Sequence, residues 1–163
     1  MTARAYPAPP SMSAWTRARE WRSFTDGSPS VWRFADNERA QPPLVLLPGA
    51  LGDASSAWRL AEAFDAHARV IAVPYPGGCD APALADGLAA LLQSLGTGPC
   101  AVWGSSYGAW WAQAFSQRHP ALVEALWLGN TFVDGADVAG SPLFDAAWLS
   151  EVSGPQVHER WHQ

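Results

Sequence analysis

The sequence is short of several features, and each shortage excludes a class of protein. No apolar run approaches the roughly 20 residues that a membrane-spanning helix requires, so we expect no membrane span. Lysine and arginine number only 10 against 15 acidic residues, and the net charge is −5. A nucleic-acid or anionic-membrane surface needs a basic face, so we expect neither partner.

Cysteine is also scarce. Cys79 and Cys100 are the only two, and neither has metal-ligand neighbours in the sequence. Free thiols in a reducing compartment are the simplest interpretation, which predicts a cytoplasmic protein without a disulfide. Nothing in the sequence indicates a metal site, a nucleotide loop or a repeat, so we expect no metal and no cofactor.

What remains is a globular composition. Hydrophobic residues make up 48% of the 163 residues and charged residues 15%, enough for one domain with a real core. The first residues lack the apolar segment of a signal peptide. We therefore predict a flexible leader over residues 1–14, a folded core over 15–137, and the start of a lid or a disordered tail over 138–163.

Strand-like and helix-like segments alternate along the core. Two short aromatic runs flank a turn at Asp26-Gly27 and predict a hairpin. From Leu44 onward the order is strand, helix, strand, helix, strand, helix, strand, with Ser55 or Ser56 capping the first helix. Such alternation predicts an α/β fold, in which a mostly parallel sheet is flanked by helices. The segments are 42–49, 55–67, 69–78, 80–96, 100–104, 107–120 and 123–134.

The third of these strands leads into a G-x-S-x-G pattern, Gly104 to Gly108, and then into a helix. This context predicts a nucleophile elbow that lifts the Ser106 hydroxyl above the sheet. Glycine is needed at 104 and 108 because strand and helix come close together there. The alternative interpretation is a Gly-Ser turn that only joins the strand to the helix.

Other residues could complete such a site. The N–H groups of Tyr107 and Ala50, the latter in the LPGALG turn after the first buried strand, are candidate oxyanion donors. Asp134 follows the last strand at the sheet edge where α/β sites are built, and is the candidate triad acid. The turn at 47–52 could equally be an ordinary strand-end turn, and Asp134 a loop residue that caps a turn. Tyr107 and Trp110 are candidate pocket residues or core aromatics.

Four segments together resemble the α/β-hydrolase fold family and, within it, the maspardin-like branch. They are PLVLLPGALGDAS, RVIAVPYP, VWGSSYGAWWAQAF and LWLGNTF with Asp134 behind it. The resemblance runs from about Trp21 to Asp137. It departs at Ala109, where relatives carry a second glycine, and at Pro48, where lipases have histidine. It implies the strand order 1-2-4-3-5-6, and two further strands, absent from this chain, that would bring the acid and the histidine.

A catalytic base is not recognisable. His67 lies on the far side of the predicted sheet, His119 lies roughly 20 Å from Ser106 along the helix, and His158 and His162 fall in the tail. Three explanations stay open: a truncated hydrolase, a non-catalytic binding protein as the maspardin resemblance allows, or a partner chain that completes the sheet. The prediction is esterase-type acyl hydrolysis through Ser106, weak or absent in this chain alone. The substrate would be a small neutral ester, amide or thioester, and the bare sheet edge would permit self-association.

Overall fold

The computed structural model describes residues 11–49, 52–133 and 136. The chain divides into two compact units, Met1–Thr131 and Phe132–Gln163, and the helices and strands described here all lie in the first. In chain order they are α1 (Met12–Ala18), β1 (Trp21–Phe24), β2 (Trp32–Asp36), β3 (Pro43–Leu47), the 3-10 helix η1 (Ala54–Ala57), α2 (Trp58–Phe64), β4 (Arg69–Ala72), α3 (Ala81–Ser94), β5 (Cys100–Ser105), α4 (Tyr107–Arg118), the 3-10 helix η2 (Pro120–Leu122) and β6 (Val123–Gly129).

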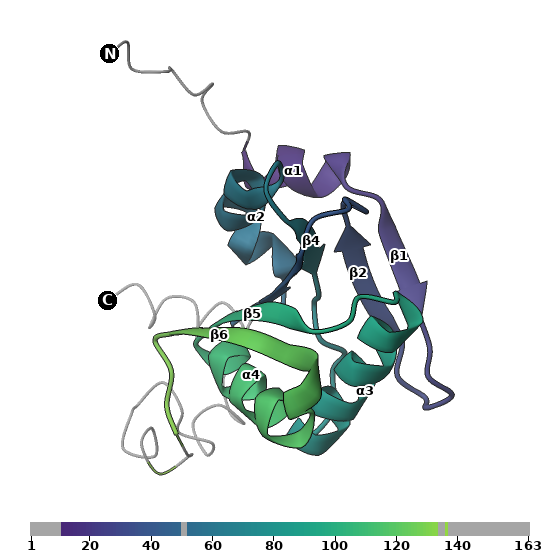
Figure 1. Cartoon of the computed structure of the whole chain (residues 1–163), viewed down its shortest axis with the longest axis vertical. Coiled ribbons are helices and arrows are strands. Elements are labelled where there is room, and N and C mark those ends of the chain that lie inside the picture. The colour runs from purple at the N-terminus through teal and green to yellow at the C-terminus, as the bar shows by residue number, and fades with distance from the viewer. Residues whose placement is uncertain (1–10, 50–51, 134–135, 137–163) are drawn as a thin grey trace, which may run out of the picture. The chain divides into compact units, whose positions relative to one another are not determined.

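The six strands form one sheet in the order β1-β2-β4-β3-β5-β6 (Figure 1). β1 and β2 make the predicted antiparallel hairpin, and β2 pairs antiparallel with β4. The remaining strands, in the sheet order β4, β3, β5 and β6, run parallel, so their carboxyl ends meet at one edge. The α/β class expected from the sequence pattern and the strand order implied by the family resemblance are both confirmed.

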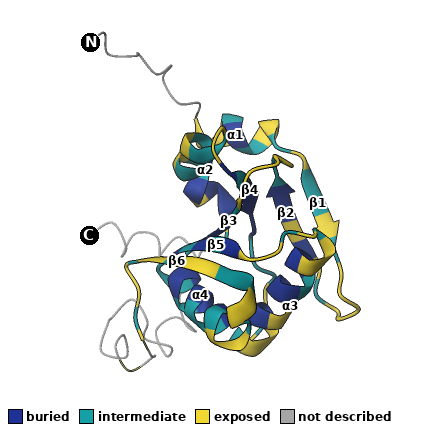
Figure 2. Cartoon of the chain, in the orientation of Figure 1, coloured by how far each residue is buried: buried dark blue, intermediate teal, exposed yellow. Residues whose placement is uncertain are grey.

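Helices cover both faces of this sheet, with α1 and α2 on one side and α3 and α4 on the other (Figure 1). The side chains of β3 alternate between the two hydrophobic clusters: Leu44 and Leu46 pack with α1 and α2, Val45 and Leu47 with α3 and α4. All four are buried, as Figure 2 shows for the central strands. The continuous apolar run in the sequence is thus explained by burial on both faces.

Helix caps explain where several helices begin. Asp80 caps α3 by accepting a hydrogen bond from the Ala83 N–H. The expected cap at Ser55 or Ser56 is wrong: Asp53 caps η1 by accepting the Ser55 N–H at 2.8 Å, and α2 follows. The Asp53 carboxylate, which precedes both serines in the chain, thus provides the cap that was expected from Ser55 or Ser56.

Helix α1 was not expected from the sequence, since it begins inside the segment predicted as leader. Ser11 caps it by accepting the Ala14 N–H, and Trp15 buries its ring between α1 and the sheet. Arg19 then joins α1's end to α2 through ion pairs with Glu62 at 2.7 Å and Asp65 at 3.2 Å.

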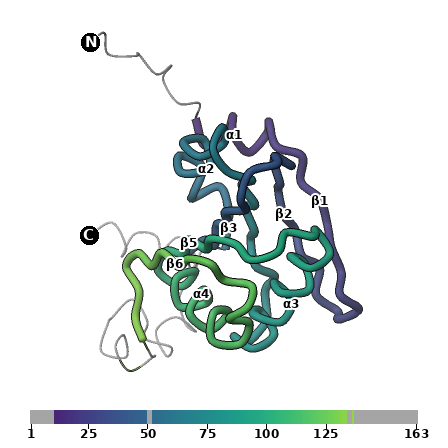
Figure 3. Tube along the Cα trace, viewed as in Figure 1, coloured from purple at the N-terminus to yellow at the C-terminus, as the bar shows by residue number. Residues whose placement is uncertain are grey.

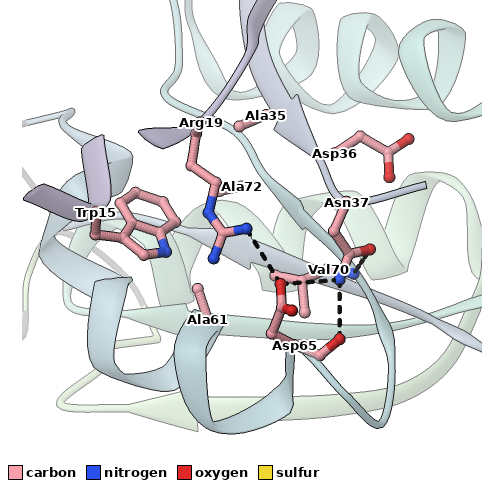
Figure 4. Close-up of a pocket in the computed structure, with 9 residues that line it drawn as sticks. All are labelled: Trp15, Arg19, Ala35, Asp36, Asn37, Ala61, Asp65, Val70 and Ala72. Atoms are coloured by element: carbon pink, nitrogen blue, oxygen red, sulfur yellow. Dashed lines mark hydrogen bonds and ion pairs between the residues drawn. The ribbon is translucent and has the colours of Figure 1, made fainter. Parts of the chain in front are cut away.

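A small cavity lies beside this ion pair, between α1, α2 and the sheet (Figure 4). In it Asn37 donates hydrogen bonds to the Ala68 carbonyl at 3.1 Å and to Asp65, which Arg39 also contacts at 2.8 Å. The lining residues are Trp15, Arg19, Ala35, Asp36, Asn37, Ala61, Asp65, Val70 and Ala72. Because Ser106 is not among them, we interpret this cavity as part of the scaffold.

Candidate active site

Ser106 occupies the junction between β5 and α4, where the trace turns sharply from strand into helix (Figure 3). Its backbone has φ 55° and ψ −123°, a region that residues other than glycine rarely adopt. Two neighbours hold it there: its N–H donates to the Gly129 carbonyl at 2.8 Å, and its carbonyl accepts from the Ala109 N–H at 2.9 Å. Strained backbone that surrounding structure enforces in this way is typical of functional sites.

The two glycines of the pattern lie where no side chain fits. A Cβ at Gly104 would come within 2.7 Å of the Ala109 Cα, and a Cβ at Gly108 within 2.8 Å of the Leu47 carbonyl carbon. Both obstacles are backbone, which cannot rotate away. The close approach of β5, α4 and the end of β3 therefore depends on glycine at both positions, as the sequence predicts.

Two segments meet beside Ser106. Tyr107 is the first residue of α4, so its N–H has no acceptor inside the helix and lies at the positive end of the helix dipole. Gly49, just after β3, lies close enough that a Cβ added to it would sit 3.6 Å from the Ser106 Cβ. The predicted second donor, Ala50, falls outside the described residues. Its neighbour Gly49 lies beside Ser106.

Tyr75, which follows β4, links these two segments and was not singled out in the sequence. Its hydroxyl donates a hydrogen bond of 2.6 Å to the Gly49 carbonyl, and its ring centroid lies 5.4 Å from that of Tyr107. Burial and the neighbouring Tyr107 raise the pKa of Tyr75 to about 12, so the hydroxyl keeps its proton at neutral pH. The available signal was its position: it follows a parallel strand at the same edge as Ser106.

An aromatic group surrounds this corner of the sheet. Tyr75 also meets Trp111 edge-on at 5.4 Å, and Tyr107 lies 5.2 Å from Trp110. Trp111 is fully buried and belongs to the core, whereas Tyr107 and Trp110 are partly exposed. Burial also raises the pKa of Tyr107 above its ordinary value.

The structure does not bring a described histidine to Ser106. His67 lies between α2 and β4, at the opposite edge of the sheet. His119 follows the far end of the 12-residue helix α4, roughly 18 Å along its axis, and its ring contacts Asp86 at 2.8 Å. Asp134, His158 and His162 fall outside the described residues.

The described part of the chain holds neither a metal-binding cluster nor a membrane-spanning helix. Its histidine, cysteine and acidic residues form no group of three that could hold a metal ion. None of its helices is both long and apolar enough to cross a membrane. Cys79 and Cys100 are free thiols, as expected.

Comparison with known proteins gives a family and a set of similar folds. The family model described as "alpha/beta hydrolase fold" matches residues 42–152. A search of curated proteins found no significant match.

Solved structures with a similar fold include a probable hydrolytic enzyme from Pseudomonas aeruginosa PAO1, with TM-score 0.68 and 24% identity, over 86% of this chain and 52% of the other. Naproxen esterase (carboxylesterase NP) from Bacillus subtilis has TM-score 0.58 and 20% identity, over 71% and 47%. Carboxylesterase CesB from Bacillus subtilis has TM-score 0.58 and 20% identity, over 70% and 46%. The matched part of this chain thus spans about half the length of these structures.

Proposed function

Because this chain belongs to the α/β-hydrolase fold family, we propose that it is a serine hydrolase that cleaves carboxylic esters through Ser106. The observation that carries the proposal is the φ of 55° at Ser106, held between a buried strand and a helix start. An ordinary connection between β5 and α4 needs no such strain at a serine. The structural similarity to two carboxylesterases fits the same reaction class.

The proposed reaction proceeds in two steps. The Ser106 oxygen attacks the ester carbonyl carbon, its proton passes to a base, and the carbonyl oxygen becomes an oxyanion that accepts hydrogen bonds from the N–H groups of Tyr107 and Ala50. The C–O bond to the alcohol breaks, and the protonated base returns its proton to the departing alkoxide. Water then attacks the acyl-enzyme by the same route and releases the carboxylic acid and the free serine.

The base and the acid of this scheme are assigned outside the described residues. Asp134 stays the proposed acid, and neither His67 nor His119 supplies the base, since both lie away from Ser106. A serine without an oriented base reacts slowly. We therefore expect weak turnover from this chain alone. The proposed substrate remains a small neutral ester, amide or thioester.

Hydrolysis of p-nitrophenyl acetate by the wild type, Ser106→Ala and Ser105→Ala tests the proposal. Ser105 is the matched control, because it precedes the junction, at the end of β5, and lacks the positive φ. We expect release of p-nitrophenol above background that is lost in Ser106→Ala and kept in Ser105→Ala. A folded wild type with no Ser106-dependent release would overturn the enzymatic proposal.

The second candidate is a non-catalytic binding protein of the maspardin-like branch. Supporting it, none of the described histidines lies within reach of Ser106, so the described residues form an elbow without a base. The Ser106→Ala variant distinguishes the two candidate functions. A binding protein would keep its partner in Ser106→Ala, whereas the esterase would lose its reaction.

A further inference from the structure

The cavity between α1, α2 and the sheet contains two N–H donors that find no acceptor among the described residues. They are the indole Nε1 of Trp15 and the Nε of Arg19, and both nitrogens are buried. Trp15 is only 2% exposed, and Figure 4 shows its indole nitrogen on the side of the ring that faces Arg19 and Ala61. A buried donor without an acceptor is strongly unfavourable, so these two hydrogens call for an acceptor inside the cavity.

The cavity has room for one very small molecule. Its volume of about 10 Å³ is close to what a single enclosed water molecule needs, and an organic ligand does not fit. Alanine and valine side chains form the apolar part of its wall: Ala35, Ala61, Val70 and Ala72. The occupant therefore has to be a water molecule or a monatomic ion of similar size.

The charges on the wall favour water over an ion. The carboxylates of Asp36 and Asp65 lie on the wall and repel an anion, while the guanidinium of Arg19 repels a cation. Burial raises the pKa of Asp65, but hydrogen bonds from Arg39 and Asn37, together with nearby arginine charges, outweigh this and hold the pKa below 3.8. The carboxylate is thus ionised at neutral pH and accepts hydrogen bonds. Water can both accept and donate, so it satisfies the unpaired donors and the carboxylates together.

We propose that this cavity is the binding site of one buried water molecule, which accepts hydrogen bonds from Trp15 Nε1 and Arg19 Nε and donates to carboxylate oxygens of the wall. The site is independent of the proposed esterase function. Because Trp15 belongs to α1 and Asp65 is the C-cap of α2, the water joins the two helices beside the Arg19–Asp65 ion pair. The short helix α1 is then held to the fold by this water as well as by the buried ring of Trp15.

Nuclear Overhauser spectroscopy of the isotope-labelled protein detects such a water at the Trp15 indole. We expect a cross-peak between water and the Trp15 Hε1 with opposite signs in NOESY and ROESY spectra, as a long-lived bound water gives, whereas proton exchange gives equal signs. Trp15→Phe identifies the indole signal, because it removes the donor and keeps an apolar ring. Trp127, which is 55% exposed, is the control and should show no long-lived water. A folded wild type without the Trp15 cross-peak would overturn the proposal.

A pair of alanine variants tests whether the water lies in this cavity. Ala61 lines the cavity from α2, whereas Ala85 is equally buried on α3 and does not line it. The hydroxyl of Ala61→Ser fills the space of the water and accepts from Trp15, so the cross-peak should disappear while the urea midpoint stays close to that of the wild type. Ala85→Ser buries a hydroxyl in a packed core, so its midpoint should fall and the cross-peak should remain. A cross-peak that persists in both variants would place the water elsewhere and overturn the proposal.

Discussion

At the scale of single residues, the site depends on backbone positions that most side chains cannot occupy. Ser106 adopts a positive φ, while Gly104 and Gly108 lie against backbone atoms of α4 and of the end of β3. Each of these features affects the stability of the fold as well as the chemistry of the site. Substitutions at these three positions can therefore separate the strain of the junction from the reactivity of the hydroxyl.

Replacing Ser106 by glycine should relieve the strain, whereas alanine should retain it. At φ 55° and ψ −123° a residue with a Cβ carries about 1–3 kcal/mol of backbone strain, which glycine removes. Part of this gain is lost again, because glycine raises the conformational entropy of the unfolded chain. We expect Ser106→Gly to be more stable than Ser106→Ala by about 1 kcal/mol, measured by urea unfolding, with both variants inactive. Equal stability of the two variants would show that the strain at the junction is no larger than the entropy cost of glycine.

Replacing Gly108 by alanine should disrupt the junction. The added Cβ would meet the backbone of Leu47 and Pro48, so we expect a loss of about 3 kcal/mol of unfolding free energy. Gly77→Ala is the control, since a Cβ there has nothing within 4 Å and the change should be neutral or stabilising. Thermal denaturation of both variants checks this. A Gly108→Ala protein as stable as Gly77→Ala would contradict the described approach of α4 to β3.

At the scale of elements, helix α3 and strand β2 pack unusually closely at Gly87. A Cβ there would come within 2.6 Å of Trp32 Cε2, and the Trp32 side chain is only 1% exposed. Trp32 also packs at 5.9 Å on Trp111 of α4, so it has little freedom to move. The hairpin strand is thereby attached to both helices of that face.

Gly87→Ala should destabilise the protein although alanine favours helices. The gain of about 1 kcal/mol in helix propensity is outweighed by overpacking of about 1–3 kcal/mol against Trp32. Combining Gly87→Ala with Trp32→Phe should reduce the penalty, because the smaller ring leaves room for the methyl group. Urea unfolding of the four proteins in this cycle gives the coupling. Additive effects would mean that the two residues do not meet.

A buried carboxylate on β2 should make the protein less stable at acid pH. The Asp36 side chain is fully buried and binds Arg69 at 2.6 Å and Arg22 at 3.3 Å. Burial raises its pKa, but the hydrogen bonds from Arg69 and the Glu38 N–H and the charges of both arginines outweigh this, so the pKa lies below 3.8. With its folded pKa depressed, Asp36 stabilises the protein above about pH 4, and this contribution is lost as pH falls through the folded pKa.

Asp36→Asn should therefore lower stability at pH 7 and flatten its dependence on pH in the acid range. We expect a loss of about 2 kcal/mol, because two partly exposed arginines lose their buried partner. Unfolding curves of both proteins between pH 3 and pH 7 test this. If the unfolding free energies of the two proteins fall in parallel down to pH 3, a group other than Asp36 governs acid unfolding.

At the scale of the whole molecule, β6 is the strand with the most exposed surface. Much of β6 is exposed (Figure 2). Among the described strands β6 pairs only with β5, and its Trp127 is 55% exposed. Edge strands with apolar side chains tend to pair with other chains. We expect this chain to associate with itself in a concentration-dependent way, and Trp127→Lys to shift the equilibrium toward monomer. Sedimentation velocity measures this. A monomer at all concentrations would contradict the expectation.

Much of this architecture could be predicted from the sequence, because local pattern and burial agree. The run from Leu44 to Leu47 is apolar at every position since both faces of β3 are covered, and the Gly104–Gly108 pattern marks the junction with α4. Tyr75 was missed although its position after a parallel strand placed it at the edge of Ser106, because its hydrogen bond to the Gly49 carbonyl leaves no pattern in the sequence. Helix α1 was missed since its seven residues follow a proline-rich stretch and are stabilised mainly by the burial of Trp15.

Covalent labelling shows directly whether Ser106 is a nucleophile. The wild type, Ser106→Ala and Ser105→Ala are incubated with a fluorophosphonate, and intact mass followed by peptide mapping locates any adduct. We expect one adduct per chain on Ser106 in the wild type and in Ser105→Ala, and none in Ser106→Ala. No adduct on a folded wild type, or an adduct that persists in Ser106→Ala, would contradict it.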